Sequence, residues 1–226
     1  MADYGRSVLT YTIFSAIYVV FRPEPSWVAI IFKTLPILCL GLLVVDTIRH
    51  ATHQPKTHYD VSILIGLILS GFGDAFLVYN YDPDFFILGL LHFAMAHASY
   101  IVAFGLRPFN AKLFAVSAIC GCGVYSVLGS GFTRHNLTGL GILYTTLIMS
   151  MCWRALARPP LPGNQETWTW SAVGAILFFI SDFVLGINKF RAPVPYANTI
   201  IMVTYYAGQL GIALSVFGRG DQLRND

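Results

Sequence analysis

Residues Ile68–Leu77 read ILSGFGDAFL, an apolar run that carries a single acidic residue, Asp74. The pattern returns 108 residues later as ILFFISDFVL over Ile176–Leu185, where Asp182 takes the place of Asp74. An ionised carboxylate at the centre of a bilayer costs about 3 kcal/mol on insertion scales. Two aspartates at matching places in apolar segments therefore call for a functional explanation.

The composition is that of an integral membrane protein. Of the 226 residues, 56% are hydrophobic and 11% are charged, with a mean hydropathy of +0.64, whereas a soluble domain carries about 25% charged residues. The formal net charge of +3 is small, and its basic residues are spread over short segments. Nucleic acid is therefore not an expected partner. The four cysteines lie in apolar stretches without a CxxC pair, so we expect no disulfide framework.

The chain contains eight segments long and apolar enough to be interpreted as membrane-spanning helices, which need about 17–20 residues. They are Ser7–Phe21, Trp27–Ile48, Val61–Asn80, Phe85–Leu106, Ala111–Leu128, Leu137–Leu156, Thr169–Asn188 and Asn198–Phe217. The first has the length of a signal-peptide core, but no small-residue cleavage site follows it, so we interpret it as a retained helix. Short loops rich in Pro, Gly and Asn separate the segments, among them Gly129–Gly131. The predicted fold is all-α, with residues 1–226 forming one bundle of eight transmembrane helices.

The basic residues predict the orientation of this bundle. Eight spans place both termini on one side of the membrane, and the loops and tails of that side carry nine basic residues against four on the other. The nine are Arg6, Arg49, Lys56, Arg107, Lys112, Arg154, Arg158, Arg219 and Arg224, and the four are Arg22, Arg134, Lys189 and Arg191. The positive-inside rule therefore places both termini in the cytoplasm. Without another address signal, the endoplasmic reticulum is the expected membrane.

Five polar residues fall at one predicted depth in the bilayer. Asp74 and Asp182 lie about six residues from the outer ends of their helices, and Lys33 lies about six residues from the outer end of its own. His92 and Tyr205 lie about seven or eight residues in. At 1.5 Å of rise per residue, the five share a layer roughly 9–12 Å below the outer helix ends. A shared polar cavity explains this alignment.

The two aspartate segments also raise the question of an internal repeat. They belong to the third and seventh predicted helices, which run in the same direction, so a duplication would relate two four-helix halves as parallel repeats. The segments share four identities in ten positions. A chance match between two apolar helices would give a similar score, so duplication and chance both remain open.

The carboxylates and the lysine suggest acid–base chemistry. One lysine does not neutralise two carboxylates, so the cheapest state in a low dielectric has one aspartate ionised beside Lys33 and the other protonated. That arrangement supplies one base and one acid. The structural alternative is that Asp74 or Asp182 merely pairs with Lys33 or makes a helix-packing hydrogen bond.

The histidines and the last predicted helix give weaker signals. His92 and His97 are five residues apart on one helix and do not share a face, and the sequence has no HxxxH or HExxH motif, so no metal site is predicted. His97 has the pattern of a hydrogen-bonded helix contact more than that of a catalyst. Tyr205 and Gln209 are i, i+4 neighbours, which either line the site or pack.

Together these residues resemble the lysoplasmalogenase family of small polytopic membrane proteins, in particular its animal members. The likeness covers nearly the whole chain. It rests on Lys33, Gly73-Asp74, Gly89, Phe93, His97, Tyr100, Phe104, Ser181-Asp182, Asn188-Lys189-Phe190, and Tyr205 with Gln209.

The resemblance implies hydrolysis of the vinyl ether (1-alkenyl) bond of the lysoplasmalogens lysoplasmenylethanolamine and lysoplasmenylcholine. The products would be a fatty aldehyde and glycerophosphoethanolamine or glycerophosphocholine, formed without a metal or organic cofactor. A vinyl ether needs a proton on carbon, and water then traps the oxocarbenium ion, which suits one protonated and one ionised aspartate. A homodimer is one possible assembly.

The resemblance also implies a set of site residues. Asp74 and Asp182 would be the catalytic pair, and Lys33 or Lys189 would meet the lipid phosphate. The residues expected to bind substrate or support the pair are Lys33, His97, Asn188, Lys189, Tyr205 and Gln209 from the resemblance, and His92 from its depth in the bilayer.

Two other kinds of membrane protein fit part of the pattern. Intramembrane carboxylates with a lysine also mark proton-coupled transporters, although neither aspartate helix shows the break that is common in carriers. A zinc-dependent lipid amidase of the ceramidase type is the second alternative, and sensitivity to strong chelators would identify it. A purely structural protein would need no common polar layer.

Overall fold

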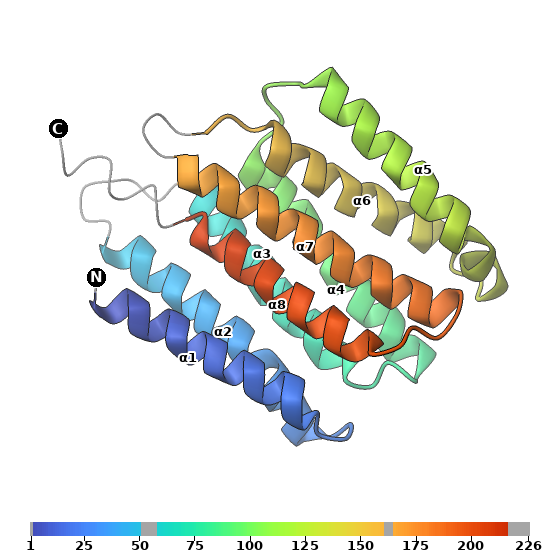
Figure 1. The fold of residues 1–226 in the computed structure, drawn as a ribbon, viewed down its shortest axis with the longest axis horizontal. Coiled ribbons are helices and arrows are strands. Elements are labelled where there is room, and N and C mark those ends of the chain that lie inside the picture. The colour runs from blue at the N-terminus through green and yellow to red at the C-terminus, as the bar shows by residue number, and fades with distance from the viewer. Residues whose placement is uncertain (1, 51–57, 161–164, 217–226) are drawn as a thin grey trace.

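The computed structural model describes residues 2–50, 58–160 and 165–216. Within these ranges the chain forms helices and no strand. The helices are α1 (Ala2–Phe21), α2 (Trp27–His50), α3 (His58–Leu77), α4 (Pro83–Phe104), α5 (Ala111–Arg134), α6 (Thr138–Ala157), α7 (Gln165–Phe190) and α8 (Ala197–Leu214). They run up and down along the long axis of the bundle, so α1 begins and α8 ends at the same end of it (Figure 1).

Most of the described helices have the length and composition of membrane spans. Six of them, α2 to α7, are long and apolar enough to cross a bilayer, and the apolar part of α1, Gly5–Phe21, is shorter. Many large apolar side chains point outward, including Leu42 on α2 and Ile119 on α5, which are 69% and 71% exposed. The all-α, polytopic membrane protein predicted from the sequence is therefore confirmed.

The predicted helix boundaries differ from the observed ones by up to six residues, and the largest difference is at the end of the fifth helix. The fifth span was expected to end at Leu128, before a glycine loop, but α5 continues through Gly129 and Gly131 to Arg134. A Cβ atom on Gly131 would stand 2.5 Å from the carbonyl oxygen of Phe190. Glycine here permits α5 to pack against the end of α7, as small residues do in membrane helices. The predicted end of the eighth span, residue 217, lies outside the described residues.

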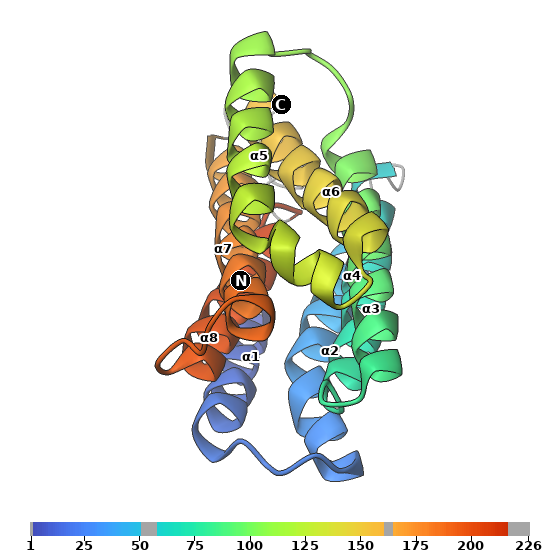
Figure 2. The ribbon, with the colours of Figure 1, turned by 90° about the vertical axis from the view of Figure 1, so that its right-hand side faces the viewer.

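Seven of the helices pack in a ring, in the order α1, α2, α3, α4, α6, α7 and α8, with α8 returning to α1. Helix α5 lies outside this ring against α6 and α7, and Figure 2 shows it at the edge of the bundle. Helix α8 also contacts α2 and α3. Side chains of α2, α3, α7 and α8 can therefore meet inside the ring.

Two helix pairs are packed closely, and each carries one of the aspartates. In the α3–α4 pair, a Cβ atom on Gly73 would stand 2.8 Å from the ring of Phe93. In the α7–α8 pair, a Cβ atom on Gly174 would stand 2.7 Å from the carbonyl oxygen of Gly208. Glycine at these contacts brings the helix backbones together. Asp74 and Asp182 are therefore held on closely packed elements.

Candidate functional site

Asp74 lies in the interior of the bundle on α3, where its side chain is only 2% exposed. Its Oδ1 atom stands 3.5 Å from Nζ of Lys33 on α2. Its Oδ2 atom accepts a hydrogen bond of 2.5 Å from the hydroxyl of Tyr205 on α8. A buried carboxylate is stable only when it is both paired and hydrogen-bonded, and Asp74 meets both conditions.

A row of hydrogen bonds leads to Asp74 across α4 and α8. The Tyr100 hydroxyl donates to Oε1 of Gln209 at 2.8 Å, and Nε2 of Gln209 donates to the Tyr205 hydroxyl at 3.3 Å. The three side chains are at most 3% exposed. Because each donor points toward Asp74, the row favours negative charge on that carboxylate.

Asp182 has a different set of partners. The Tyr144 hydroxyl of α6 donates to its Oδ2 atom at 2.6 Å, and Nε2 of His97 on α4 lies 3.3 Å from the same oxygen. His97 is also 3.2 Å from the Tyr144 hydroxyl. Among the described residues, no lysine or arginine lies within 4 Å of Asp182. Its carboxyl group thus differs from that of Asp74 in having no nearby cationic side chain of fixed charge.

Both aspartates line one polar cavity of about 310 Å³, together with Lys33 and Tyr205. Of the five residues for which depth predicted a shared cavity, four therefore line one cavity, and the fifth, His92, does not. Its exposed lining residues lie at the end of the bundle where α1 meets α2, and we call this part its mouth. The mouth is lined by Arg22, Glu24, Asn80 and Asn198.

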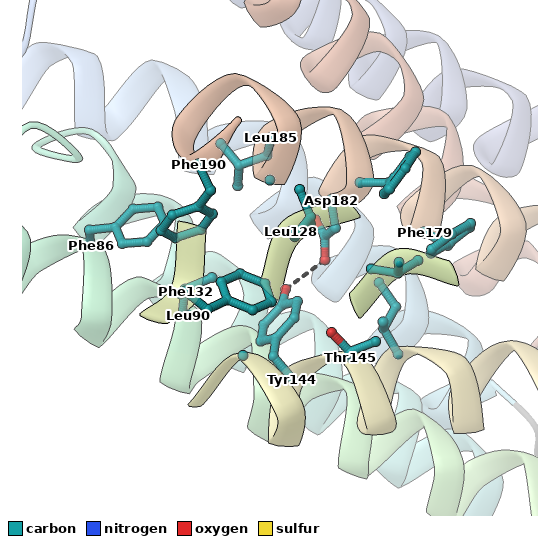
Figure 3. Close-up of a pocket in the computed structure, with 15 residues that line it drawn as sticks. Phe86, Leu90, Leu128, Phe132, Tyr144, Thr145, Phe179, Asp182, Leu185 and Phe190 are labelled. Atoms are coloured by element: carbon teal, nitrogen blue, oxygen red, sulfur yellow. Dashed lines mark hydrogen bonds between the residues drawn. The ribbon is translucent and has the colours of Figure 1, made fainter. Parts of the chain in front are cut away.

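Asp182 also lines a second, apolar cavity, which we name the Asp182 pocket. Its walls come from α4, α5, α6 and α7 and include Phe86, Leu128, Phe132 and Phe179. Figure 3 shows the Tyr144 hydroxyl pointing from α6 at the carboxyl group of Asp182, with the phenyl rings around them. Asp182 is thus placed between a polar and an apolar space.

His92 is not part of the cavity lining. Its Nδ1 atom bonds the carbonyl of Leu88 in its own helix at 2.8 Å, and its ring lies against those of Phe72 and Phe76, with centroids 5.9 and 4.9 Å away. The depth of a residue in the bilayer does not say which way its side chain points around the helix axis. The depth predicted from the sequence therefore grouped His92 with the aspartates.

Asn188 and Lys189 make contacts at the outer ends of the helices. Oδ1 of Asn188 accepts the backbone N–H of Val194 at 3.0 Å and so holds the turn that follows α7. Nζ of Lys189 donates to the Asn80 carbonyl at 2.8 Å and lies 4.7 Å from the ring centroid of Phe86. Neither side chain lines the polar cavity, although Asn80 does.

Tyr144 is the site residue that sequence reasoning missed. It lies seven residues into the predicted sixth span, Leu137–Leu156. The same depth count that grouped the aspartates would therefore have placed it in their layer. Tyrosine is common in membrane helices, so residue type alone does not mark Tyr144 as a site residue. Its contact with Asp182 does.

The described residues contain no group of three or more His, Cys, Asp and Glu side chains placed to hold a metal ion. His97 and Asp182 lie together, but no third such ligand joins them in this part of the chain. A zinc site needs at least three protein ligands.

Comparisons with known proteins give a consistent picture. The pattern that describes the YhhN family matches residues 28–216. Lysoplasmalogenase TMEM86A of Homo sapiens is 40% identical over 199 residues, which cover 85% of this chain and 79% of the relative. Lysoplasmalogenase TMEM86B of Homo sapiens is 36% identical over 191 residues, with 84% and 76% covered. A lysoplasmalogenase of Mycobacterium bovis is 31% identical over 159 residues, with 67% and 58% covered. No solved structure matches this chain.

Proposed function

This chain belongs to the YhhN family, and from that premise we propose that it is a lysoplasmalogenase, a membrane hydrolase of the vinyl ether bond of lysoplasmalogens. Lysoplasmenylethanolamine and lysoplasmenylcholine are the proposed substrates. The observation that carries the proposal is the pair of aspartates with unlike partners on one polar cavity. This pair supplies the acid and the base that the reaction needs.

The partners of each aspartate suggest its role. Asp74 lies beside the Lys33 ammonium and at the end of a row of donors, so it is the carboxylate that stays ionised. Asp182 has no lysine or arginine beside it in the described part of the chain, so it is the carboxylic acid. Its Oδ2 atom, which faces two possible donors, then acts as the carbonyl oxygen, and Oδ1 carries the proton.

The proposed reaction begins with transfer of a proton to carbon and continues with attack of water. Asp182 gives its proton to the vinyl carbon that bears the alkyl chain, and the other vinyl carbon becomes part of an oxocarbenium ion. The ionised Asp74 stabilises this cation and orients a water molecule, which attacks the cationic carbon. The proton that the attacking water loses restores the protonated Asp182, and the resulting hemiacetal breaks down to a fatty aldehyde and the glycerophospho alcohol. One water is consumed in each cycle.

We extend the proposal to the arrangement in the membrane. Residues 1–226 form one domain with eight crossings, in which α1 and α8 join the six longer spans. An even number of crossings agrees with the start of α1 and the end of α8 at one end of the bundle (Figure 1). The excess of basic residues at that end supports cytoplasmic termini, and the endoplasmic reticulum is the proposed membrane.

The same proposal includes two parallel four-helix halves. His97 follows Asp74 by 23 residues, and Tyr205 follows Asp182 by the same number. Each bonds the aspartate of the other half, because His97 contacts Asp182 and Tyr205 contacts Asp74. The helix contacts also correspond. A duplication equates α2 with α6 and α4 with α8, and the contact between α4 and α6 has its counterpart in the contact between α8 and α2. A crossed pair of contacts at equal spacing supports duplication over a chance match.

The decisive experiment uses purified protein and two lipids. One is lysoplasmenylcholine, and the other is its saturated 1-alkyl analogue, which lacks the double bond that accepts the proton. Aldehyde release from the first lipid alone is the expected result. Absence of aldehyde from lysoplasmenylcholine and lysoplasmenylethanolamine contradicts the proposal, and ion or solute flux in liposomes without turnover would favour the transporter.

A further inference from the structure

The Asp182 pocket meets the polar cavity at Asp182, which lines both. Its lining side chains come from α4 to α7 and are apolar except for those of Asp182, Tyr144 and Thr145. The Tyr144 hydroxyl already bonds Asp182. The pocket therefore has little to offer a polar ligand.

The pocket has room for a narrow apolar group. Its volume is about 50 Å³, whereas a single water requires about 10–15 Å³ and two to four polar partners. Leu128 and Ile148 in its wall are 4% and 3% exposed, so this part of the wall is buried in the protein. This volume accommodates the first few carbons of a hydrocarbon chain.

We propose that the Asp182 pocket binds the carbons of the 1-alkenyl chain that lie next to the double bond. This inference rests on the proposed function. The glycerophospho group then lies in the polar cavity, whose mouth carries Arg22, and the vinyl ether lies at Asp182, where the two spaces meet.

The direction of the chain agrees with the chemistry at each aspartate. The carbon that accepts the proton is the one that bears the alkyl chain, and Asp182 lines the chain pocket. The carbon that accepts water is bonded to the ether oxygen, and it points toward the polar cavity that Asp74 lines. A substrate bound in the reverse direction would place its chain among Lys33, Asp74 and Tyr205, where a buried charge pair would lose its polar surroundings.

Two substitutions of the same kind on α6 test the proposal. Ile148 lines the Asp182 pocket, whereas Ile142 is 48% exposed and lines the separate outer groove between α5 and α6. The change Ile148→Phe fills the pocket, and Ile142→Phe is the matched control. The measured quantity is kcat/KM for a hexadecenyl substrate divided by kcat/KM for an analogue whose alkenyl group is only an ethenyl unit.

Ile148→Phe is expected to lower this ratio about tenfold, which is the size of effect that a few carbons in an apolar pocket produce. Ile142→Phe is expected to leave the ratio unchanged. A second variant, Leu128→Ala, enlarges the pocket and is expected to raise turnover of a substrate with a methyl branch next to the double bond. Equal ratios for the wild type and Ile148→Phe overturn the proposal.

If a variant does not stay monodisperse in detergent, photolabelling of the unmodified protein tests the proposed chain pocket instead. The unmodified protein is labelled with a 1-alkyl lysophosphatidylcholine that carries a diazirine within the first few chain carbons. Label on the pocket-lining residues of α4 to α7, such as Phe86, Leu128 and Ile148, supports the proposal, and label confined to residues outside the pocket overturns it. Failure of the proposed function gives a distinguishable result: the wild type would release no aldehyde from either vinyl ether substrate.

Discussion

At the scale of single residues, Asp74 and Asp182 differ mainly in what lies beside them. Asp74 has a lysine and a tyrosine, one on each carboxylate oxygen, whereas Asp182 has a tyrosine and a histidine on one oxygen. Two chemically identical side chains thus have different electrostatic surroundings in one cavity. Unlike surroundings are the usual means by which two carboxyl groups take an acid role and a base role.

Replacing either carboxyl group by an amide is expected to lower aldehyde release by at least about a hundredfold, since general acid–base catalysis contributes 10²–10⁴-fold. The variants are Asp74→Asn and Asp182→Asn, and the matched control is Asp84→Asn, which changes an exposed aspartate at the start of α4. The assay is aldehyde release by purified, monodisperse protein. Wild-type activity in either of the first two variants contradicts the assigned roles.

The ion pair between Lys33 and Asp74 predicts a stability effect that is separate from activity. Lys33→Met leaves the buried Asp74 carboxylate without its cation, which is expected to cost about 3–5 kcal/mol of folding free energy. The double variant Lys33→Met with Asp74→Asn should recover most of that loss, because no charge is then left unpaired. Thermal unfolding in detergent measures both, and equal losses in the single and double variants would show that the pair is not coupled.

The sequence predicted the aspartates, the lysine and Tyr205 because charge and polarity in a membrane helix are visible in the letters themselves. It did not predict that Tyr144 of α6 bonds Asp182, and it grouped His92 with a cavity that His92 does not line. Both failures have one cause, which is that the rotation of a helix about its axis depends on packing. Packing is set by contacts such as that of Gly131 with Phe190, between residues far apart in the chain.

At the scale of elements, the α7–α8 pair positions Asp182 and Tyr205 relative to each other. Its backbones are in contact at Gly174, Gly208 and Gly211, so no side chain separates them there. Helix α7 carries an aspartate of the site and α8 carries the tyrosine that bonds the other aspartate. The spacing of these two helices therefore affects the surroundings of both aspartates.

A larger residue at this contact is expected to force the helices apart. In Gly174→Val, the new Cβ atom would lie 2.7 Å from backbone atoms of α8, which cannot rotate away, and the expected cost is about 1–3 kcal/mol or more. Gly123→Val is the control, because no atom lies within 4 Å of a Cβ placed there. A lower unfolding temperature together with lower activity is expected for the first variant only, and equal unfolding temperatures would contradict the close contact.

At the scale of the whole molecule, the polar cavity opens at one end of the bundle. Arg22, directly after the end of α1, and Asn198, in the first turn of α8, line it, and these two helix ends lie at the opposite end of the bundle from the start of α1 (Figure 1). With the proposed cytoplasmic termini, the cavity opens toward the non-cytoplasmic side, and the headgroup of the substrate enters from that side.

Single cysteines report this orientation. In a variant without the four native cysteines, Glu24→Cys lies at the cavity mouth and Arg107→Cys lies in the loop between α4 and α5 at the other end, and both native side chains are exposed. In sealed microsomes an impermeant maleimide is expected to label Arg107→Cys, whereas Glu24→Cys should require permeabilisation. The reverse pattern would place the termini on the other side.

The chain order of the partners has a consequence for how the protein is made. Lys33 precedes Asp74 by one helix, and both His97 and Tyr144 precede Asp182. Helices that enter the bilayer in the order of synthesis therefore bring each carboxyl group to a partner that is already there. Neither carboxyl group therefore enters the bilayer before its first partner, and only the contact of Tyr205 with Asp74 is completed at the end, when α8 arrives.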